Sequence, residues 1–254
     1  MRRRSVLLAV AGVAAAAAVA APSIATSPTH GDTHITSVTV NEGRSLILGI
    51  QQKATFTVSI TAGDDSGIKS VSPVGVWGPK YGVLKMSPMH CRALRSSATT
   101  SVCTGSASVS VPKHQVWNDE AGTWFVDAQV NANDGDAFRS GTLGGFSVKR
   151  AALLTSPPPA GAAAGAPVRL TGWFARASWD NGRYFGYGDV QVQLQFRPDG
   201  SDTWTTLRTV APNISGVLDT TVTPTRSGSY AWYFSGDKWS GPALSPVHHI
   251  SVPG

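Results

Sequence analysis

The chain is poor in charged residues, and the few that it has are scattered. Asp, Glu, Lys and Arg make up 14% of its 254 residues, and the formal net charge is +6. Three basic residues, Arg2 to Arg4, stand at the very start, so the rest of the chain carries only a mild positive excess. A nucleic-acid-binding protein would show clustered Lys and Arg. We therefore predict no nucleic-acid partner.

The chain also lacks the short motifs of common enzyme classes. It contains no G-x-S-x-G, no H-E-x-x-H and no phosphate-binding glycine loop ahead of a helix. Because a catalytic triad assembles from distant residues, a hydrolase of unrecognised type stays open as a third hypothesis. The favoured prediction is a protein without enzymatic activity.

Long apolar runs are absent after the first 25 residues. Val6–Ala20 is apolar but shorter than the roughly 20 residues that span a bilayer. It follows a cationic start and precedes small residues that offer a cleavage position after Ala25. This order predicts a cleaved signal peptide over residues 1–25, with general secretion favoured over the twin-arginine route. The mature protein is predicted to be secreted and to have no membrane span.

Cysteine is almost absent, since Cys91 and Cys103 are the only two. In an exported chain an even pair predicts a disulfide. A metal or redox pair is less favoured because the spacing is not C-x-x-C and no histidine flanks both sulfurs. The pair is interpreted as a covalent staple.

Helical patterns are scarce, whereas strand patterns recur. Strict alternation of apolar and polar residues, the mark of a half-buried strand, is clearest at Ala54–Ile60 and Val190–Phe196. The other predicted strands are Ser37–Val40, Ala107–Val111, Trp124–Ala132, Phe146–Lys149, Leu153–Thr155, Val168–Phe174, Trp204–Val210, Val217–Val222, Tyr230–Phe234 and Val247–Val252. Short strands separated by turn residues predict a β-sandwich in each half.

The two halves share a further pattern. Gly122–Trp124 and Gly228–Tyr230 each open a strand with an early aromatic residue, as in strand F of immunoglobulin-like sandwiches. We therefore predict an all-β fold of two tandem immunoglobulin-like β-sandwich domains after the signal peptide. The predicted ranges are a flexible N-terminus over 26–35, a first domain over 36–150 and a second over 151–254. The Pro- and Ala-rich stretch 157–166 is interpreted as a loop of the second domain, so the domains have almost no linker.

Several segments resemble a known group of proteins. The second half, with Gln193–Arg197, Trp204–Val210, Gly228–Tyr230 and Ser235–Asp237, resembles an immunoglobulin-like repeat of secreted actinobacterial proteins. The whole mature chain is similar to a two-domain family of such proteins. The first half carries the likeness in Gly31–Thr33, Phe56–Ser59, Asp65–Ile68 and Gly122–Trp124. The resemblance implies the fold and secretion. It says little about function, because most members are uncharacterised and only some are labelled calcium-binding.

Two loops of the first domain are acidic. In this fold the B–C and F–G loops lie at the same end of the sandwich. Here they carry four carboxylates and an amide, namely Asp64, Asp65, Asn133, Asp134 and Asp136. Calcium takes 6–8 oxygen ligands, and clustered carboxylates repel unless something neutralises them. The loops predict a Ca2+ site, and the alternative is ordinary turns whose charge is balanced by Lys69 and Arg139.

The corresponding loops of the second domain are aromatic. They contain Trp179, Tyr184, Tyr187 and Trp239. Rings beside polar groups could bind sugars, which makes a cell-wall or polysaccharide-binding module the alternative function. Chain order, however, turns this end toward the first domain, so a structural role at the junction is favoured. The predicted partner is thus an extracellular protein or polysaccharide of unknown identity.

One further cluster lies just after the predicted signal peptide. His30, Asp32 and His34 could hold copper or zinc. The favoured alternative is a frayed terminus.

Overall fold

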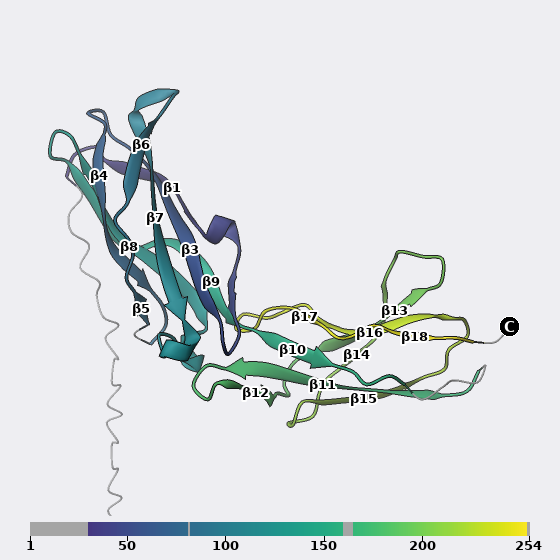
Figure 1. Ribbon diagram of the computed structural model, residues 1–254. Coiled ribbons are helices and arrows are strands. Elements are labelled where there is room, and N and C mark those ends of the chain that lie inside the picture. The colour runs from purple at the N-terminus through teal and green to yellow at the C-terminus, as the bar shows by residue number, and fades with distance from the viewer. Residues whose placement is uncertain (1–29, 81, 160–164, 253–254) are drawn as a thin grey trace, which may run out of the picture.

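The computed structural model describes residues 30–80, 82–159 and 165–252. The predicted signal peptide and its cleavage position lie outside this range. The described part consists of strands and three 3-10 turns, and its two β-sandwiches lie end to end at an angle (Figure 1). None of its helical segments has the length and apolar character that a bilayer span requires.

The first sandwich has two sheets of four and five strands. The first sheet runs in the order β1 (His34–Val40), β3 (Lys53–Gly63), β7 (Ser97–Ser110) and β6 (His90–Leu94). The second runs in the order β2 (Leu46–Leu48), β9 (Ala137–Arg150), β8 (Gly122–Ala132), β4 (Ile68–Trp77) and β5 (Val83–Leu84). All pairings are antiparallel except that of β2 with β9. In immunoglobulin letters these sheets are A-B-E-D and A′-G-F-C-C′.

Three 3-10 turns complete the first sandwich. They are η1 (Asn41–Gly43), η2 (Val111–Lys113) and η3 (Asn118–Glu120). η1 lies where the chain crosses from β1 in one sheet to β2 in the other.

The second sandwich begins one residue after the first ends, since β9 ends at Arg150 and β10 begins at Ala152. One sheet places β11 (Val168–Ser178) between β10 (Ala152–Thr155) and the strands β12 (Arg183–Gly186) and β15 (Val217–Val222). The other runs β14 (Thr205–Val210), β13 (Val192–Pro198) and β16 (Gly228–Phe234), and β16 also pairs with β17 (Ala243–Leu244) and β18 (His248–Ile250). The predicted all-β fold of two immunoglobulin-like sandwiches is therefore confirmed.

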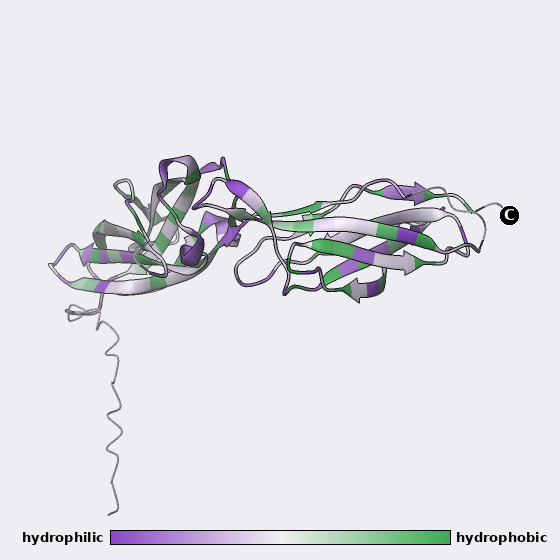
Figure 2. Ribbon diagram, turned by 90° about the horizontal axis from the view of Figure 1, so that it is seen from below, coloured by the Kyte–Doolittle hydropathy of each residue, from purple (hydrophilic) through white to green (hydrophobic). Residues whose placement is uncertain are grey.

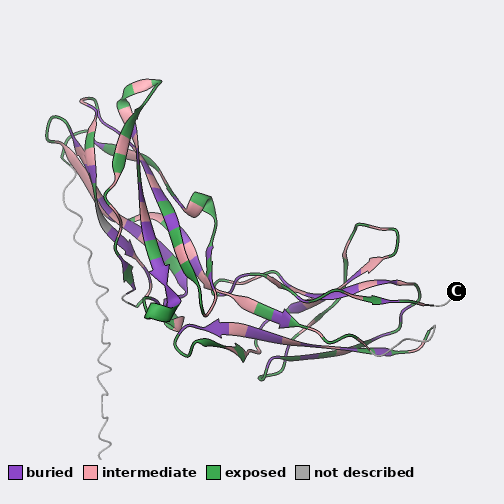
Figure 3. Ribbon diagram, in the orientation of Figure 1, coloured by how far each residue is buried: buried purple, intermediate pink, exposed green. Residues whose placement is uncertain are grey.

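Alternating side chains build both cores. Along β8 every second residue from Trp124 to Ala132 is at most 2% exposed, as period-two geometry requires. Buried and exposed residues alternate along the strands in Figure 3, and apolar segments alternate with polar ones in Figure 2. In the second core, Trp232 is buried and the rings of Phe174 and Phe234 lie edge to face at 4.8 Å.

The sequence patterns missed several strands. Strands β2, β5, β6 and β12 are short, with five residues or fewer. Strand β4 is long, but Pro73 and Gly75 break its alternation, and its register with β8 shifts between Ile68 and Ser70 and between Pro73 and Gly75. Proline is tolerated within sheets at such bulges. The chain also differs from the flexible N-terminus expected over 26–35, because His30 pairs with Ala137 and β1 begins at His34.

Candidate functional site

Five aspartates gather at the end of the first domain that faces away from the second (Figure 1). They come from three chain segments: the segment just before β1, the β3–β4 loop and the β8–β9 hairpin. Ligand oxygens of Asp32, Asp64 and Asp136 lie within 4.8 Å of one another, and so do those of Asp64, Asp65 and Asp134. We call these five residues the distal acidic cluster. Asp64 belongs to both groups and is its centre.

Asp64 is the buried member, with 2% exposure. One carboxylate oxygen accepts hydrogen bonds from the backbone N–H and the hydroxyl of Ser66, at 2.9 and 2.6 Å. The other accepts the Thr33 hydroxyl at 2.6 Å. Burial raises the pKa of Asp64, but these hydrogen bonds outweigh it and hold that pKa below its ordinary value. Asp64 is thus ionised and fixed in place.

The β3–β4 loop and the β8–β9 hairpin are tied together by hydrogen bonds. The Asn133 side-chain N–H2 donates to the Ser66 carbonyl at 2.8 Å, and the Asn133 backbone N–H donates to the Gly67 carbonyl at 3.0 Å. Gly67 has φ +83° and lies close to the backbone of Ala98, so a side chain there would be strained. Asn133 therefore joins the two loops.

Asp32 is a member of the cluster that the sequence analysis assigned elsewhere. The pairing of His30 with Ala137 carries the segment over the hairpin, where the Asp32 N–H donates to the Asp136 carboxylate at 3.3 Å. Burial, followed by repulsion from Asp65 and Asp64, raises the pKa of Asp32. Within the described residues, groups of three or more metal-ligating side chains contain only aspartates, so His30 and His34 belong to none. In the sequence, Asp32 is visible as an acidic residue between His30 and His34, and it was grouped with them instead of with the acidic loops.

Arg139 does not balance the charge of the acidic loops, as the ordinary-turn alternative supposed. Arg139 pairs with Asp127 at 3.4 Å, on the middle of the β8–β9 pair, and not with the acidic loops. No ion pair of the described residues includes a member of the distal acidic cluster. Neither Lys69 nor any other cation of the described chain therefore lies within ion-pair distance of the cluster's carboxylates.

The two cysteines form the predicted disulfide. Cys91 on β6 and Cys103 on β7 lie opposite each other in the antiparallel register. Cys103 is fully buried. The bond attaches the edge strand β6 to its sheet, so the predicted structural staple is confirmed.

The aromatic loop residues of the second domain do not share one exposed face. Trp179 is 1% exposed and belongs to the core of the first domain, where its indole N–H donates to the Leu48 carbonyl at 2.9 Å. Tyr184 is half-buried and packs against the same core. Tyr187 lies under the guanidinium of Arg176, and Trp239 is 48% exposed. The four rings are thus divided between the domain contact and its rim.

Backbone bonds close the domain junction around these rings. Ala177 N–H donates to the Ala151 carbonyl, and the backbone of Arg150 bonds in both directions with the 239–241 turn. The Asn118 side chain donates to Asp180 and Ser178 across the junction, at 2.6 and 3.0 Å. With a single residue between β9 and β10, this contact restricts movement between the domains.

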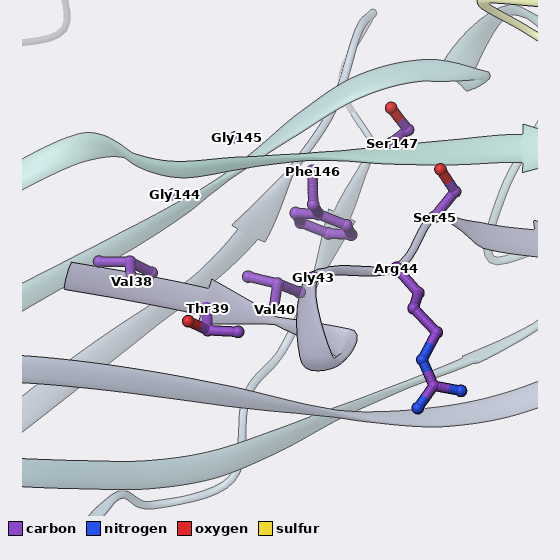
Figure 4. A pocket seen from close by; sticks show the side chains of 10 residues that line it. All are labelled: Val38, Thr39, Val40, Gly43, Arg44, Ser45, Gly144, Gly145, Phe146 and Ser147. Carbon is purple, nitrogen blue, oxygen red and sulfur yellow. The ribbon is translucent and has the colours of Figure 1, made fainter.

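A pocket of about 260 Å3 opens between β1 and β9 at the edge of the first sandwich. Figure 4 shows the Phe146 ring directed toward Val40, while Arg44 points away. Arg44 pairs with Glu42. Gly144 in its wall has φ +52°, and a Cβ there would lie 2.4 Å from the Val38 side chain. The pocket is an opening left where the chain changes sheets, and it gathers no set of ionisable groups.

A groove of about 630 Å3 lies beside η3. Glu120 is buried in its wall and accepts the Trp117 N–H at 3.0 Å, which caps the turn. Burial raises the pKa of Glu120 more than this hydrogen bond lowers it. The Trp124 indole donates to the Glu120 carbonyl at 2.7 Å. This carboxylate therefore has a structural role that the sequence analysis missed.

Comparison with known proteins assigns no family. No protein-family model and no curated protein matches the chain. Similar solved structures include the D0-D1 domain of Intimin, at 12% identity over 85% of this chain and 98% of that chain, with a TM-score of 0.28. Three N-terminal domains of the bacteriophage RB49 Highly Immunogenic Outer Capsid protein are 9% identical over 87% and 71%, with a TM-score of 0.33. Dimeric latent PorU from Porphyromonas gingivalis is 11% identical over 87% and 20%, with a TM-score of 0.28. Likenesses this weak carry no argument about function.

Proposed function

We propose that this is an exported, non-enzymatic binding or structural protein whose distal acidic cluster binds calcium. The observation that carries the proposal is the convergence of five aspartates from three chain segments around the buried Asp64. The disulfide supports an extracellular location, because such bonds persist in oxidising compartments. The rigid pair of domains would present the cluster at one end.

The spacing of the oxygens suits a shared ion. Calcium binds its oxygen ligands at about 2.3–2.6 Å, so two ligands of one ion lie at most about 5 Å apart. The oxygens in each group of three are within 4.8 Å of one another. Asn133 and the backbone carbonyls of the loops are further oxygen donors of the kind that calcium accepts.

The charge of the cluster supports a cation in the same place. Burial, followed by repulsion from Asp65 and Asp64, raises the pKa of Asp32, so the neighbouring carboxylates disfavour its ionised form. A divalent ion would offset that repulsion and would tie the segment before β1 to both loops. Calcium binding should therefore stabilise the first domain in particular.

The test is thermal unfolding of the purified protein in EDTA and then in about 10 mM calcium. Extracellular calcium modules have Kd values of about 10⁻⁴–10⁻³ M. Binding to the native state alone would then add about 1.4–2.7 kcal/mol, which raises the midpoint by several degrees. Asp134→Asn and Asp65→Asn change exposed members of the cluster and should each reduce the shift.

Two controls distinguish calcium binding at the cluster from general effects of charge and ionic strength. Asp202→Asn alters an exposed aspartate in the β13–β14 loop of the second domain and should leave the calcium shift unchanged. Magnesium at the same concentration controls for ionic strength. A midpoint that calcium moves no further than magnesium does, or that moves equally in Asp134→Asn and the parent, would contradict the calcium site.

A second candidate function is carbohydrate binding at the domain junction. The observation that favours it is the position of Tyr187 and Trp239 in the wall of a pocket there, away from the buried Trp179. Aromatic faces beside polar groups suit sugar rings. Binding to insoluble polysaccharides should fall in Trp239→Ala, and equal retention of this variant and the parent would count against it.

A further inference from the structure

The pocket at the domain junction contains two arginines. It has a volume of about 260 Å3 and is lined by side chains of both domains. Arg150, the last residue of β9, and Arg176 on β11 lie in its wall with Tyr187, Trp239, Asn118 and Asp119. The pocket is smaller than the roughly 300–1,000 Å3 of drug-sized sites, so it suits one small unit of a ligand.

Neither arginine is paired with a carboxylate. Within the described residues, no acidic oxygen lies within 4 Å of the Arg150 or Arg176 guanidinium. Arg150 Nε donates to the Ala177 carbonyl at 2.5 Å, and an Arg176 terminal nitrogen makes a long contact of 3.5 Å with the Ser240 hydroxyl. The Nε of Arg176 is buried and has no hydrogen-bond partner among the described residues. This Nε is enclosed by protein, so the groups of Arg176 that an anion in the pocket would meet are its terminal nitrogens.

The two guanidinium groups also repel each other. Burial, followed by the positive charge of Arg176, lowers the pKa of Arg150 to about 10. Both groups stay charged at neutral pH, so the pocket holds two cations that an anion would stabilise. Arginine matches oxyanions well, because its planar fork makes two parallel hydrogen bonds.

Acidic side chains nearby have other partners, with one exception. Asp180 accepts the backbone and side-chain N–H groups of Asn118, and Asp237 accepts the backbone N–H groups of Trp239 and Ser240. Asp119 lines the pocket and is exposed, so water screens its charge. Asp180 and Asp237 attract Arg150 electrostatically, but neither lies within 4 Å of a guanidinium, so neither forms an ion pair with the two arginines.

The aromatic residues of the pocket narrow the choice of anion. The Arg176 guanidinium lies 3.8 Å from the centre of the Tyr187 ring, which fixes its plane. Trp239 is 48% exposed at the rim and offers a face to an apolar surface. A sugar ring has such a surface in its C–H groups, and a uronic acid carries a carboxylate on the same ring.

We propose that the junction pocket binds an acidic sugar, with its carboxylate on Arg150 and Arg176 and its ring against Trp239. This proposal rests on the second candidate function and narrows it to anionic polysaccharides. Because both domains line the pocket, a bound sugar would also brace the junction.

The test is an NMR titration of the purified protein with glucuronate, glucose and sodium sulfate. Glucuronate should shift the Trp239 indole N–H signal, and 0.5 M sodium chloride should weaken its binding about tenfold. Arg176→Gln should lower the affinity about tenfold or more, because it removes a charged donor pair. Arg208→Gln, on the exposed strand β14, is the matched control and should bind as the parent does.

Each other outcome overturns the proposal in a distinct way. Equal binding of glucose and glucuronate would mean that the pocket does not select for a carboxylate. This would refute the acidic-sugar site and would leave the second candidate function standing. Equal binding of sulfate and glucuronate, with no loss in Trp239→Ala, would mean that the pocket takes an oxyanion without a sugar. No binding of either sugar would refute both the acidic-sugar site and the second candidate function. Thermal melting shows whether each variant is folded. If Arg176→Gln does not fold, Trp239→Ala still tests the site.

Discussion

Replacing Trp179 with alanine should destabilise the first domain, although Trp179 belongs to the second. Its indole is 1% exposed and is part of the first domain's core, and its N–H is bonded to the carbonyl of the fully buried Leu48. The second domain's own core does not include it. The substitution therefore removes a contact between the domains without changing the core of the second domain, which supplies the residue.

The expected loss follows from the area and the hydrogen bond. A buried tryptophan removes about 150–250 Å2 from water, which corresponds to about 4–6 kcal/mol as an upper value. Losses measured for buried aromatic residues changed to alanine are about 3–5 kcal/mol. The Leu48 carbonyl also loses its side-chain donor, which adds to the cost. We expect about 4 kcal/mol in the first domain.

The assay must resolve the domains, because two-domain unfolding is not two-state. Hydrogen exchange should accelerate by two to three powers of ten in β2 and β8, and little in β13 and β16. Ile214→Ala, at a residue 91% exposed in the second domain, should change neither by more than about 0.5 kcal/mol. A loss below about 1.5 kcal/mol in the first domain would refute the reasoning, since the indole would then not lie in that core in solution.

Two further predictions concern the first domain. Replacing Cys91 and Cys103 together by alanine should cost about 3 kcal/mol, because the bond closes a loop with a sequence separation of 12; urea unfolding with and without reductant measures this, and unchanged stability would contradict it. Gly78→Ala should destabilise by about 1–3 kcal/mol or more, because a Cβ there would lie 2.2 Å from the buried Trp124 ring. Gly145→Ala is its control, with its nearest contact at 3.4 Å, and an equal loss in both variants would refute the packing argument.

Alternation of residue types explains how much of the fold could be predicted. Strands β3, β8 and β13 bury one face only, so their period-two pattern is visible in the sequence. Strand β4 carries bulges, and β2 has three residues, so neither shows a periodic signal. Their places follow from pairing with neighbours rather than from their own residues.

The candidate site could be predicted only where loops belong to neighbouring strands. The placement of Asp64, Asp65, Asp134 and Asp136 follows from the B–C and F–G geometry of the fold. Asp32 was missed because its position depends on one bridge, between His30 and Ala137, that no local pattern encodes. Likewise, the burial of Trp179 in the first domain's core and the exposure of Trp239 at the rim depend on the angle between the domains.

The parallel pairing of β2 with β9 has a mechanical consequence. Leu46 lies opposite Val148, and Leu48 lies opposite Arg150. The chain therefore enters β2 at one end of the paired segment and leaves β9 at the other end. Tension pulling residue 46 away from residue 150 would load these bonds in shear, so that they would have to break together rather than one after another. We expect a force peak in single-molecule pulling of the first domain, and proline at Ile47 should lower it.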